Sequence, residues 1–290
     1  MTPSSQWARG SNQYRKIPQL RYQPSASGPE HPLPIATPTA PQDSEEQLAV
    51  TGVRWDSSRI YLENIRPSEL SRARARFQKT LPELIWNAAA LEGNTFTLPE
   101  VRTLLDGVTV AGKPLDDEHQ ILALSGAYRR LDQLLANREF ALNKAISDEL
   151  HGLIAVHEAI ESGHFRGEGA VTGGGTVRLS NNTTVPGLEH GLAGQSLIDR
   201  FDDATAYINS IEDARLRALV YFAAATRAQF YFDGNKRTAR LMATGMLMSA
   251  GFDAISVPFA RRLEFNLTLD ELFASNDATP LIQFLATCTI

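Results

Sequence analysis

The stretch Gln229–Arg240 gathers the residues of this chain that are best suited to bind an anion. Asp233-Gly234-Asn235 tolerates positive backbone φ angles and predicts a tight turn, after which a helix should start at Asn235 or Lys236. The first turn of a helix exposes unpaired backbone N–H groups and carries a partial positive charge. Because Gly234 has no side chain, a ligand can approach this backbone closely.

Three basic residues at the same helix start strengthen this prediction: Lys236, Arg237 and Arg240. Arg237 and Arg240 are three residues apart and therefore lie on one helix face. Free N–H groups and cationic side chains form an anion site suited to phosphates, and Asp233 could hold a divalent cation that bridges phosphate oxygens. The residues alone also allow a plainer interpretation, in which Asp233 caps an ordinary interhelical turn and solvent surrounds the basic side chains.

Two helices must position this turn, and the chain from about Gly52 onward shows the same helical periodicity. The segments before and after the turn, 212–230 and 236–251, each carry apolar residues on one side. Thr97 and Glu100 form a capping box for another helix. Further helices are predicted at 67–76, from Pro82 to Gly93-Asn94, and at 116–138, 142–158, 190–210, 258–274 and from Thr279-Pro280 onward.

One segment breaks the helical pattern. Residues 163–175 contain six glycines, and an alternating stretch, Asn181-Asn182 and residues 183–185 follow. This pattern predicts an extended hairpin or flap over 163–185, inserted among helices, with a bare surface loop as the alternative. We therefore expect an all-α domain with one small β element.

The first 48 residues differ from the rest of the chain. They hold eight of its 15 prolines and few aliphatic residues, so they cannot bury enough apolar area to offset the entropy of ordering. We predict a disordered tail over 1–48, which serves as a tether or as a docking peptide. The folded body should cover about 49–290.

Composition excludes several classes of protein. The 290 residues carry a net charge of -5, which argues against a nucleic-acid partner. The longest wholly apolar run, 218–225, is too short to span a membrane, and a single cysteine, Cys288, excludes an internal disulfide. We expect a soluble cytoplasmic protein, and the sequence leaves its oligomeric state, including a homodimer, open.

The stretch 229–240 resembles the core motif of Fic (Fido) proteins, His-Pro-Phe-x-Asp/Glu-Gly-Asn-Gly/Lys-Arg-x-x-Arg. Phe230 stands at the position of Pro, Tyr231 replaces Phe conservatively, and Gln229 stands at the position of the His. Five consecutive residues and one further arginine match the motif: Asp233, Gly234, Asn235, Lys236, Arg237 and Arg240.

A second stretch, ending in Glu92-Gly93-Asn94, resembles the inhibitory helix of Fic proteins, Ser/Thr-x-x-x-Glu-Gly-Asn. Ala88 occupies the Ser/Thr position. The resemblance implies that Glu92 reaches the second motif arginine, Arg240, and blocks productive placement of the ATP γ-phosphate. Without the core motif, these residues would indicate only the C-terminal end of a helix.

The two resemblances together cover roughly residues 52–285. They imply a Fic-type bundle of about eight helices, with N-terminal helices that include the inhibitory helix at 49–115 and the Fic core at 116–290. They also imply AMP transfer from ATP to a protein hydroxyl, with Mg²⁺ at Asp233 and phosphates at 234–240. The target, which the sequence does not identify, should dock by strand addition at the flap 163–185.

The residue at position 229 bears on whether transfer occurs. In the family the motif His accepts the proton of the attacking hydroxyl, whereas a carboxamide has no basic pKa near neutrality. A positioned general base contributes roughly 10²–10⁴ in rate, so Gln229 should leave phosphate binding intact and impair turnover. Two alternatives stay open: an inactive nucleotide-binding or protein-interaction pseudo-enzyme, and a variant chemistry with an already ionised nucleophile.

Overall fold

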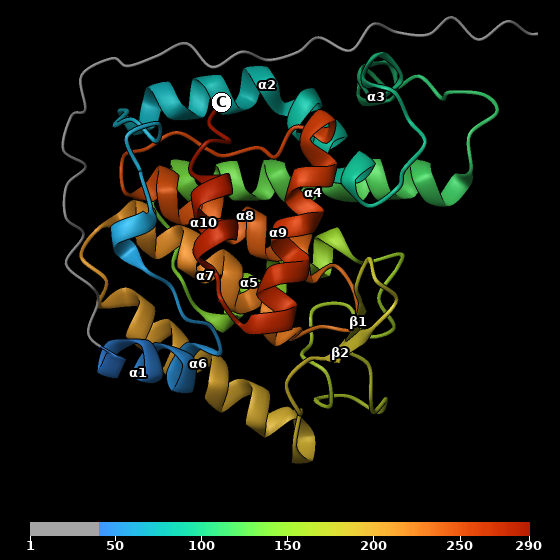
Figure 1. Cartoon of the computed structure of the whole chain (residues 1–290). Coiled ribbons are helices and arrows are strands. Elements are labelled where there is room, and N and C mark those ends of the chain that lie inside the picture. Colours follow the sequence, from blue (N-terminus) through green and yellow to red (C-terminus); the bar gives the residue numbers. More distant parts are fainter. Residues whose placement is uncertain (1–40) are drawn as a thin grey trace, which may run out of the picture. The chain divides into compact units, whose positions relative to one another are not determined.

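The computed structural model describes residues 41–290, which form ten α-helices and one short antiparallel hairpin (Figure 1). The predicted all-α fold with a small β element is confirmed. The helices are α1 (Pro41–Thr51), α2 (Leu70–Leu91), α3 (Leu98–Leu105), α4 (Leu115–Ala136), α5 (Lys144–Ile154), α6 (Gln195–Asn209), α7 (Ala214–Ala228), α8 (Asn235–Ser249), α9 (Arg262–Ser275) and α10 (Thr279–Leu285).

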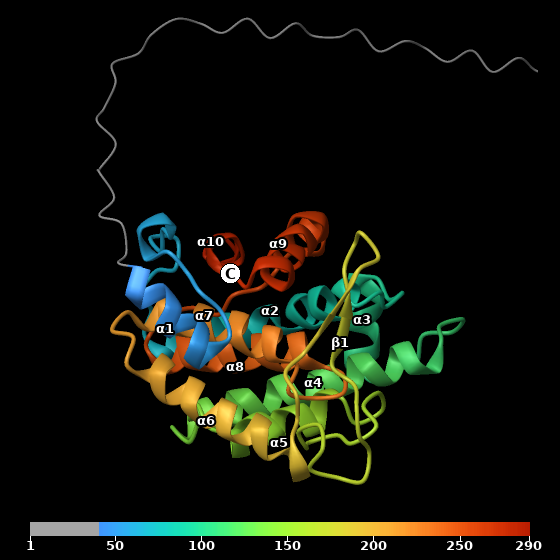
Figure 2. The same cartoon turned by 60° about the horizontal axis from the view of Figure 1, so that its bottom comes forward.

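Helix α8 is the centre of the bundle. It packs against α7, α5, α4 and α2 (Figures 1 and 2), and only Lys236 and Ser249 among its 15 residues are not buried. Its polar first turn therefore continues directly into a helix that is fixed on several sides by core packing. This rigidity gives the predicted anion site a defined position in the fold.

Helix α2 corrects the prediction of two helices at 67–76 and from Pro82 onward. It is one 22-residue helix with Pro82 inside it. An interior proline removes one backbone hydrogen bond and costs about 3 kcal/mol. The helix continues through Pro82 because residues on both sides of it, including Phe77, Leu84 and Ile85, are buried in the core.

Helix α1 corrects part of the predicted disordered tail. Residues 41–48 belong to this helix, which packs against α6. The Arg200 guanidinium of α6 donates to the backbone carbonyls of Ala49 and Val50. Residues 1–40 of the predicted tail lie outside the described residues, and the boundary between 49–115 and 116–290 stays a prediction.

The predicted hairpin is present as β1 (Thr176–Arg178) and β2 (Thr184–Pro186), with Val177 opposite Val185. Figure 2 shows it projecting beside α9. At its turn, the backbone N–H and hydroxyl of Ser180 donate to the Asp270 carboxylate on α9. The flap is thus held to the helical body at its tip.

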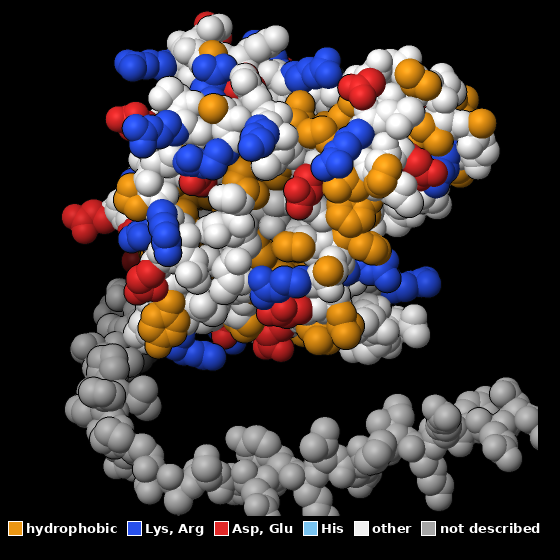
Figure 3. Space-filling model, turned by 90° about the horizontal axis from the view of Figure 1, so that it is seen from above, with side chains coloured by type: hydrophobic (Ala, Val, Ile, Leu, Met, Phe, Trp, Pro, Cys, Tyr) orange, Lys and Arg blue, Asp and Glu red, His pale blue; other side chains and the backbone are white. Residues whose placement is uncertain are grey.

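The surface carries charges of both signs. On the face shown in Figure 3, lysine and arginine side chains alternate with aspartate and glutamate. Such mixing is expected from 28 basic and 33 acidic residues. Within residues 41–290, no helix combines the length and the apolar character needed to cross a lipid bilayer.

Candidate functional site

A cavity of about 590 Å³ lies between the flap strand β1, the start of α8 and one side of α9. The end of α2 reaches its edge with Leu91 and Glu92. The predicted site residues Asn94 and Arg240 lie outside the lining. The other predicted site residues all line the cavity: Glu92, Gln229, Asp233, Gly234, Asn235, Lys236 and Arg237.

The turn before α8 is held by the side chain of Asn235. Its Oδ1 accepts from the Tyr231 N–H at 2.9 Å, and its Nδ2 donates to the Tyr231 carbonyl at 2.7 Å. Gly234 has φ +70°, and a Cβ there would lie 3.2 Å from the Ala155 Cβ. Asn235 and Gly234 therefore shape the turn that presents the first N–H groups of α8 to the cavity.

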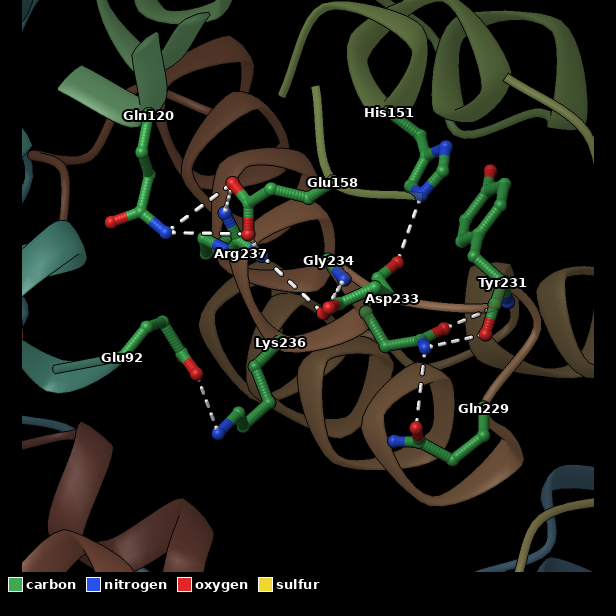
Figure 4. Close-up of polar contacts among 11 residues, drawn as sticks. Glu92, Gln120, His151, Glu158, Gln229, Tyr231, Asp233, Gly234, Lys236 and Arg237 are labelled. Carbon is green, nitrogen blue, oxygen red and sulfur yellow. Dashed lines mark hydrogen bonds and ion pairs between the residues drawn. The ribbon is translucent and has the colours of Figure 1, made fainter. Parts of the chain in front are cut away.

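Gln229 ends α7 in the left-handed conformation, with φ 54°. Its Nε2 donates to the Thr226 carbonyl at 2.7 Å. Its Oε1 accepts from Asn235 at 3.2 Å, the contact drawn at Gln229 in Figure 4. Both ends of the carboxamide are thus engaged by the protein. This side chain holds the turn and offers no basic atom to a hydroxyl in the cavity.

Glu92 pairs with Lys236 instead of Arg240, which corrects the predicted contact. The Glu92 carboxylate lies 3.0 Å from the Lys236 Nζ (Figure 4). Burial alone would raise the pKa of Glu92, but the positive charges of Lys236, Arg237 and Arg240 outweigh it and lower this pKa. An ionised glutamate therefore occupies the edge of the cavity beside the first basic residue of α8.

Arg237 is held by a carboxylate that the sequence did not single out. Its Nη1 and Nη2 donate to the two oxygens of Glu158 at 2.6 and 2.8 Å, and its side chain is 3% exposed. Burial alone would lower the pKa of Arg237, but Glu158 raises it above its usual value. Glu158 follows α5 in a stretch predicted as helix. Nothing in the sequence around Glu158 indicates that it contacts Arg237, 79 residues later.

Arg240 is buried without a hydrogen-bond partner among the described residues. It is 3% exposed, all three guanidinium nitrogens lack an acceptor, and its guanidinium carbon lies 5.8 Å from the centre of the Phe265 ring. The buried Oε1 of Glu92 also lacks a donor. Unpaired buried charged groups are costly, so Arg240 favours an additional anion, whereas the free oxygen of Glu92 favours a donor.

The segment that follows α2 also reaches Arg237, through Gln120 of α4 and Glu158. Asn94 Nδ2 donates to the Gln120 Oε1 at 2.9 Å, and Gln120 Nε2 donates to Glu158 at 3.3 Å. Glu158 in turn binds Arg237 (Figure 4). Thus Glu92 contacts Lys236 directly, while Asn94 is linked to Arg237 by two intermediate side chains.

A buried histidine supports the turn from behind. The His151 ring stacks on Tyr231, with 3.7 Å between ring centroids. The Gly163 N–H donates to Nδ1 at 2.9 Å, so Nε2 carries the proton and donates to the Asp233 carbonyl at 2.9 Å. Burial lowers the pKa of His151 to about 4. The neutral ring supports the turn, and its one lone pair, on Nδ1, already accepts the Gly163 N–H.

This pKa predicts a loss of stability in acid. Between the unfolded pKa of about 6.5 and the folded value of about 4, the unfolded chain binds the additional proton. The free energy of unfolding should therefore fall as pH decreases through this window, by about 3 kcal/mol in total. Urea unfolding of the parent and of His151→Asn at pH 7 and pH 5 should show a smaller pH effect in the variant. His190→Asn is the control and should show the same pH effect as the parent. An equal pH effect in the parent and in His151→Asn would refute the assignment of this pH dependence to His151.

The site fits a magnesium ion held jointly by the protein and a phosphate. Mg²⁺ typically uses one or two carboxylates together with substrate phosphates. The Asp233 side chain is 60% exposed at the cavity, and its Oδ1 accepts from the Gly234 N–H at 2.5 Å. No group of three or more metal-ligating side chains occurs among residues 41–290, so Asp233 would act with ligand oxygens.

Sequence comparison relates this chain to proteins that carry the Fic name. No protein-family model matches the chain. A Drosophila persimilis protein named protein adenylyltransferase Fic is 30% identical over 242 residues, which cover 81% of this chain and 44% of that protein. The chain thus spans less than half the length of the curated relatives it matches.

Two solved structures share the fold. Fic-1 from C. elegans (residues 134–508) has a TM-score of 0.57 and 21% identity, covering 76% of this chain and 67% of that chain. A Fic domain containing signaling protein from Bacteroides thetaiotaomicron has a TM-score of 0.60 and 20% identity, covering 85% and 92% respectively. These likenesses support the arrangement of helices around the cavity.

Proposed function

This chain belongs to the Fic (Fido) family, and from that premise we propose that its cavity binds ATP with Mg²⁺ for AMP transfer to a protein hydroxyl. The observation that carries the proposal is the start of α8, where Gly234, Lys236 and Arg237 line one cavity with Asp233. Backbone N–H groups and cations at a helix start bind phosphates. Asp233 would hold the Mg²⁺, which would neutralise phosphate charge in the cavity.

The proposed resting state is autoinhibited by the end of α2. Glu92 pairs with Lys236, and Glu158 pairs with Arg237, so the two cations that the start of α8 contributes to the cavity are both paired with a carboxylate. A triphosphate must compete with at least one of these acids for its cation. We assign the inhibition to the Glu92–Lys236 pair, because Glu92 stands at the cavity edge and Arg240 lies behind it.

Transfer should be weak in this chain. The attacking hydroxyl must lose a proton, and Gln229 cannot accept it. His151 cannot replace the missing base, since its Nδ1 already accepts from Gly163 and its Nε2 carries the proton. The chain's own residues would then bind and orient ATP, while the general-base contribution is missing.

A non-catalytic nucleotide-binding protein is the second candidate. The hydrogen bonds that both ends of the Gln229 carboxamide make within the protein favour this candidate. They indicate that the side chain stabilises the turn and takes no part in a reaction. The third candidate is an enzyme whose nucleophile is already ionised, such as a phosphate. Such a nucleophile would need no general base. All three share the phosphate site and differ only in what the cavity does after ATP has bound.

Glu92→Gly should bind ATP·Mg²⁺ roughly 10–100-fold more tightly than the parent chain. The variant removes both the charge that repels phosphates and the side chain that occupies Lys236, and a charge-assisted contact contributes about 1.5–3 kcal/mol. Isothermal titration calorimetry with ATP and a non-hydrolysable analogue measures this difference. Glu92→Gln, which keeps the size of the side chain, separates the effect of charge from that of bulk.

Glu83→Gln is the matched control, because Glu83 is an exposed acid on the same helix. It loses the same charge far from Lys236 and should bind ATP as the parent does. Equal ATP affinity in parent and Glu92→Gly would contradict the inhibitory role of Glu92. Absence of ATP binding by Glu92→Gly would contradict all three nucleotide hypotheses and leave a protein-interaction domain.

A further inference from the structure

Arg166 lies where the two ends of the flap meet the start of the core motif. It is 2% exposed. Its Nε donates to the Gln229 carbonyl at 2.7 Å, and its Nη2 donates to the Leu188 carbonyl at 2.6 Å. Its Nη1 donates to the Gly174 carbonyl at 3.0 Å. One guanidinium therefore joins the segment before β1, the segment after β2 and the residue that stands at the family's His position.

The backbone of Arg166 strengthens this junction. Its N–H donates to the Phe230 carbonyl at 2.8 Å, so main chain and side chain grip consecutive carbonyls of the motif. Burial lowers the pKa of Arg166, and no carboxylate contributes to that shift. An arginine keeps its charge in proteins. The charge is thus balanced by carbonyl dipoles, which ties the guanidinium to this geometry.

The glycines before β1 are shaped by this arginine. Gly174 and Gly175 have φ +73° and +80°, and a Cβ on Gly175 would lie 2.4 Å from the Arg166 guanidinium carbon. At these positions glycine permits close packing on the guanidinium. The glycine run that predicted the flap therefore includes a fixed anchor at its C-terminal end.

We propose that Arg166 is a positioning residue that sets the flap relative to Gln229. The flap residues between Gly175 and Leu188 are connected to the body at this junction, where the Gly187 N–H also donates to the Gly175 carbonyl and the Leu188 N–H to the Ala228 carbonyl. Arg166 holds Gln229 through its carbonyl, so it fixes the distance between a segment docked on the flap and position 229. This last consequence rests on the proposed function.

Hydrogen exchange of the full chain tests the anchor without any ligand. In Arg166→Met, amides of the flap segment 173–188 should exchange roughly tenfold faster or more, because both ends of the flap lose their hydrogen bonds to a charged group. Amides of α8 should keep the parent rate. Arg166→Lys keeps the charge but not the planar fork, so its flap amides should exchange at a rate between those of the parent and of Arg166→Met. This variant provides the test if Arg166→Met does not fold.

Arg217→Met is the matched control, since the Arg217 guanidinium also donates only to backbone carbonyls, those of Ile211 and Glu212. It should leave the flap amides unchanged. Unchanged flap exchange in both Arg166 variants would overturn the proposal. Equal acceleration in the flap and in α8 would also overturn it, by showing a general loss of stability.

Transfer kinetics add a second readout in the Glu92→Gly/Gln229→His background. Arg166→Lys should lower kcat roughly 10–100-fold, because misplacing reacting groups is costly, and should leave the KM for ATP within about twofold. A raised KM at unchanged kcat would overturn the positioning role. If this background transfers no AMP at all, the proposed function fails, and hydrogen exchange still decides the role of Arg166.

Discussion

Gln229→His should raise AMP transfer roughly 10²–10⁴-fold when it is introduced into the Glu92→Gly variant. The gain is the usual contribution of a positioned general base, because an imidazole can accept the proton of the attacking hydroxyl and a carboxamide cannot. Transfer of labelled AMP from ATP to protein, in the chain itself or in a supplied target, measures the difference. The single variant Glu92→Gly should stay near background.

The local structure at position 229 is compatible with this exchange. Gln229 has φ 54°, a left-handed conformation in which histidine is enriched among residues other than glycine. Asn235 also holds the turn through the Tyr231 backbone, so the loss of its contact with Gln229 should leave the start of α8 in place. The α8 start should therefore bind ATP equally in both variants.

Gln229→Met is the control, because it removes the carboxamide without adding a base. It should be as inactive as the Gln229 protein in the Glu92→Gly background. Robust AMP transfer by the Gln229 protein would refute the argument that a base is missing. It would instead favour chemistry with an ionised nucleophile.

Arg237→Met should lower the free energy of unfolding by about 3 kcal/mol. The change leaves Glu158 without the two hydrogen bonds that it accepts from Arg237. Breaking a buried ion pair costs about 3–5 kcal/mol, and the lower end applies because the Glu158 side chain is partly exposed. Urea unfolding at pH 7 measures this loss.

A double-mutant cycle with Glu158→Gln isolates the pair, since the double variant should recover part of the stability. Arg74→Met serves as the control. Arg74 also binds a carboxylate with two hydrogen bonds, to Asp132, but its side chain is 27% exposed. We expect a loss of no more than about 1 kcal/mol for such a pair. Equal losses in both arginine variants, with no coupling to Glu158, would contradict the buried pair.

The sequence predicted the local parts of the site because their causes are local. Asp233-Gly234-Asn235 defines a turn through its own backbone preferences, and the apolar spacing after it defines α8. Glycines 173–175 and the alternation after them likewise predicted the hairpin. The family resemblance then related these local features to phosphate binding.

The contacts made by the charged side chains could not be predicted in this way. Glu158 lies 79 residues before Arg237 in the chain, and only the packing of the helices brings them together. For the same reason Lys236, and not Arg240, meets Glu92. Arg166 gave no signal, because its partners are carbonyls, which every residue carries. Pro82 indicated a helix start, but core burial on both sides outweighed its local effect.

A crystal structure of the Glu92→Gly variant with Mg²⁺ and a non-hydrolysable ATP analogue tests the proposed phosphate site at the start of α8 most directly. The proposal predicts phosphate oxygens within hydrogen-bond distance of the backbone N–H groups at the start of α8, with Lys236 turned toward them and Mg²⁺ beside Asp233. A triphosphate bound elsewhere on the protein, while the cavity at Gly234 holds none, would contradict it.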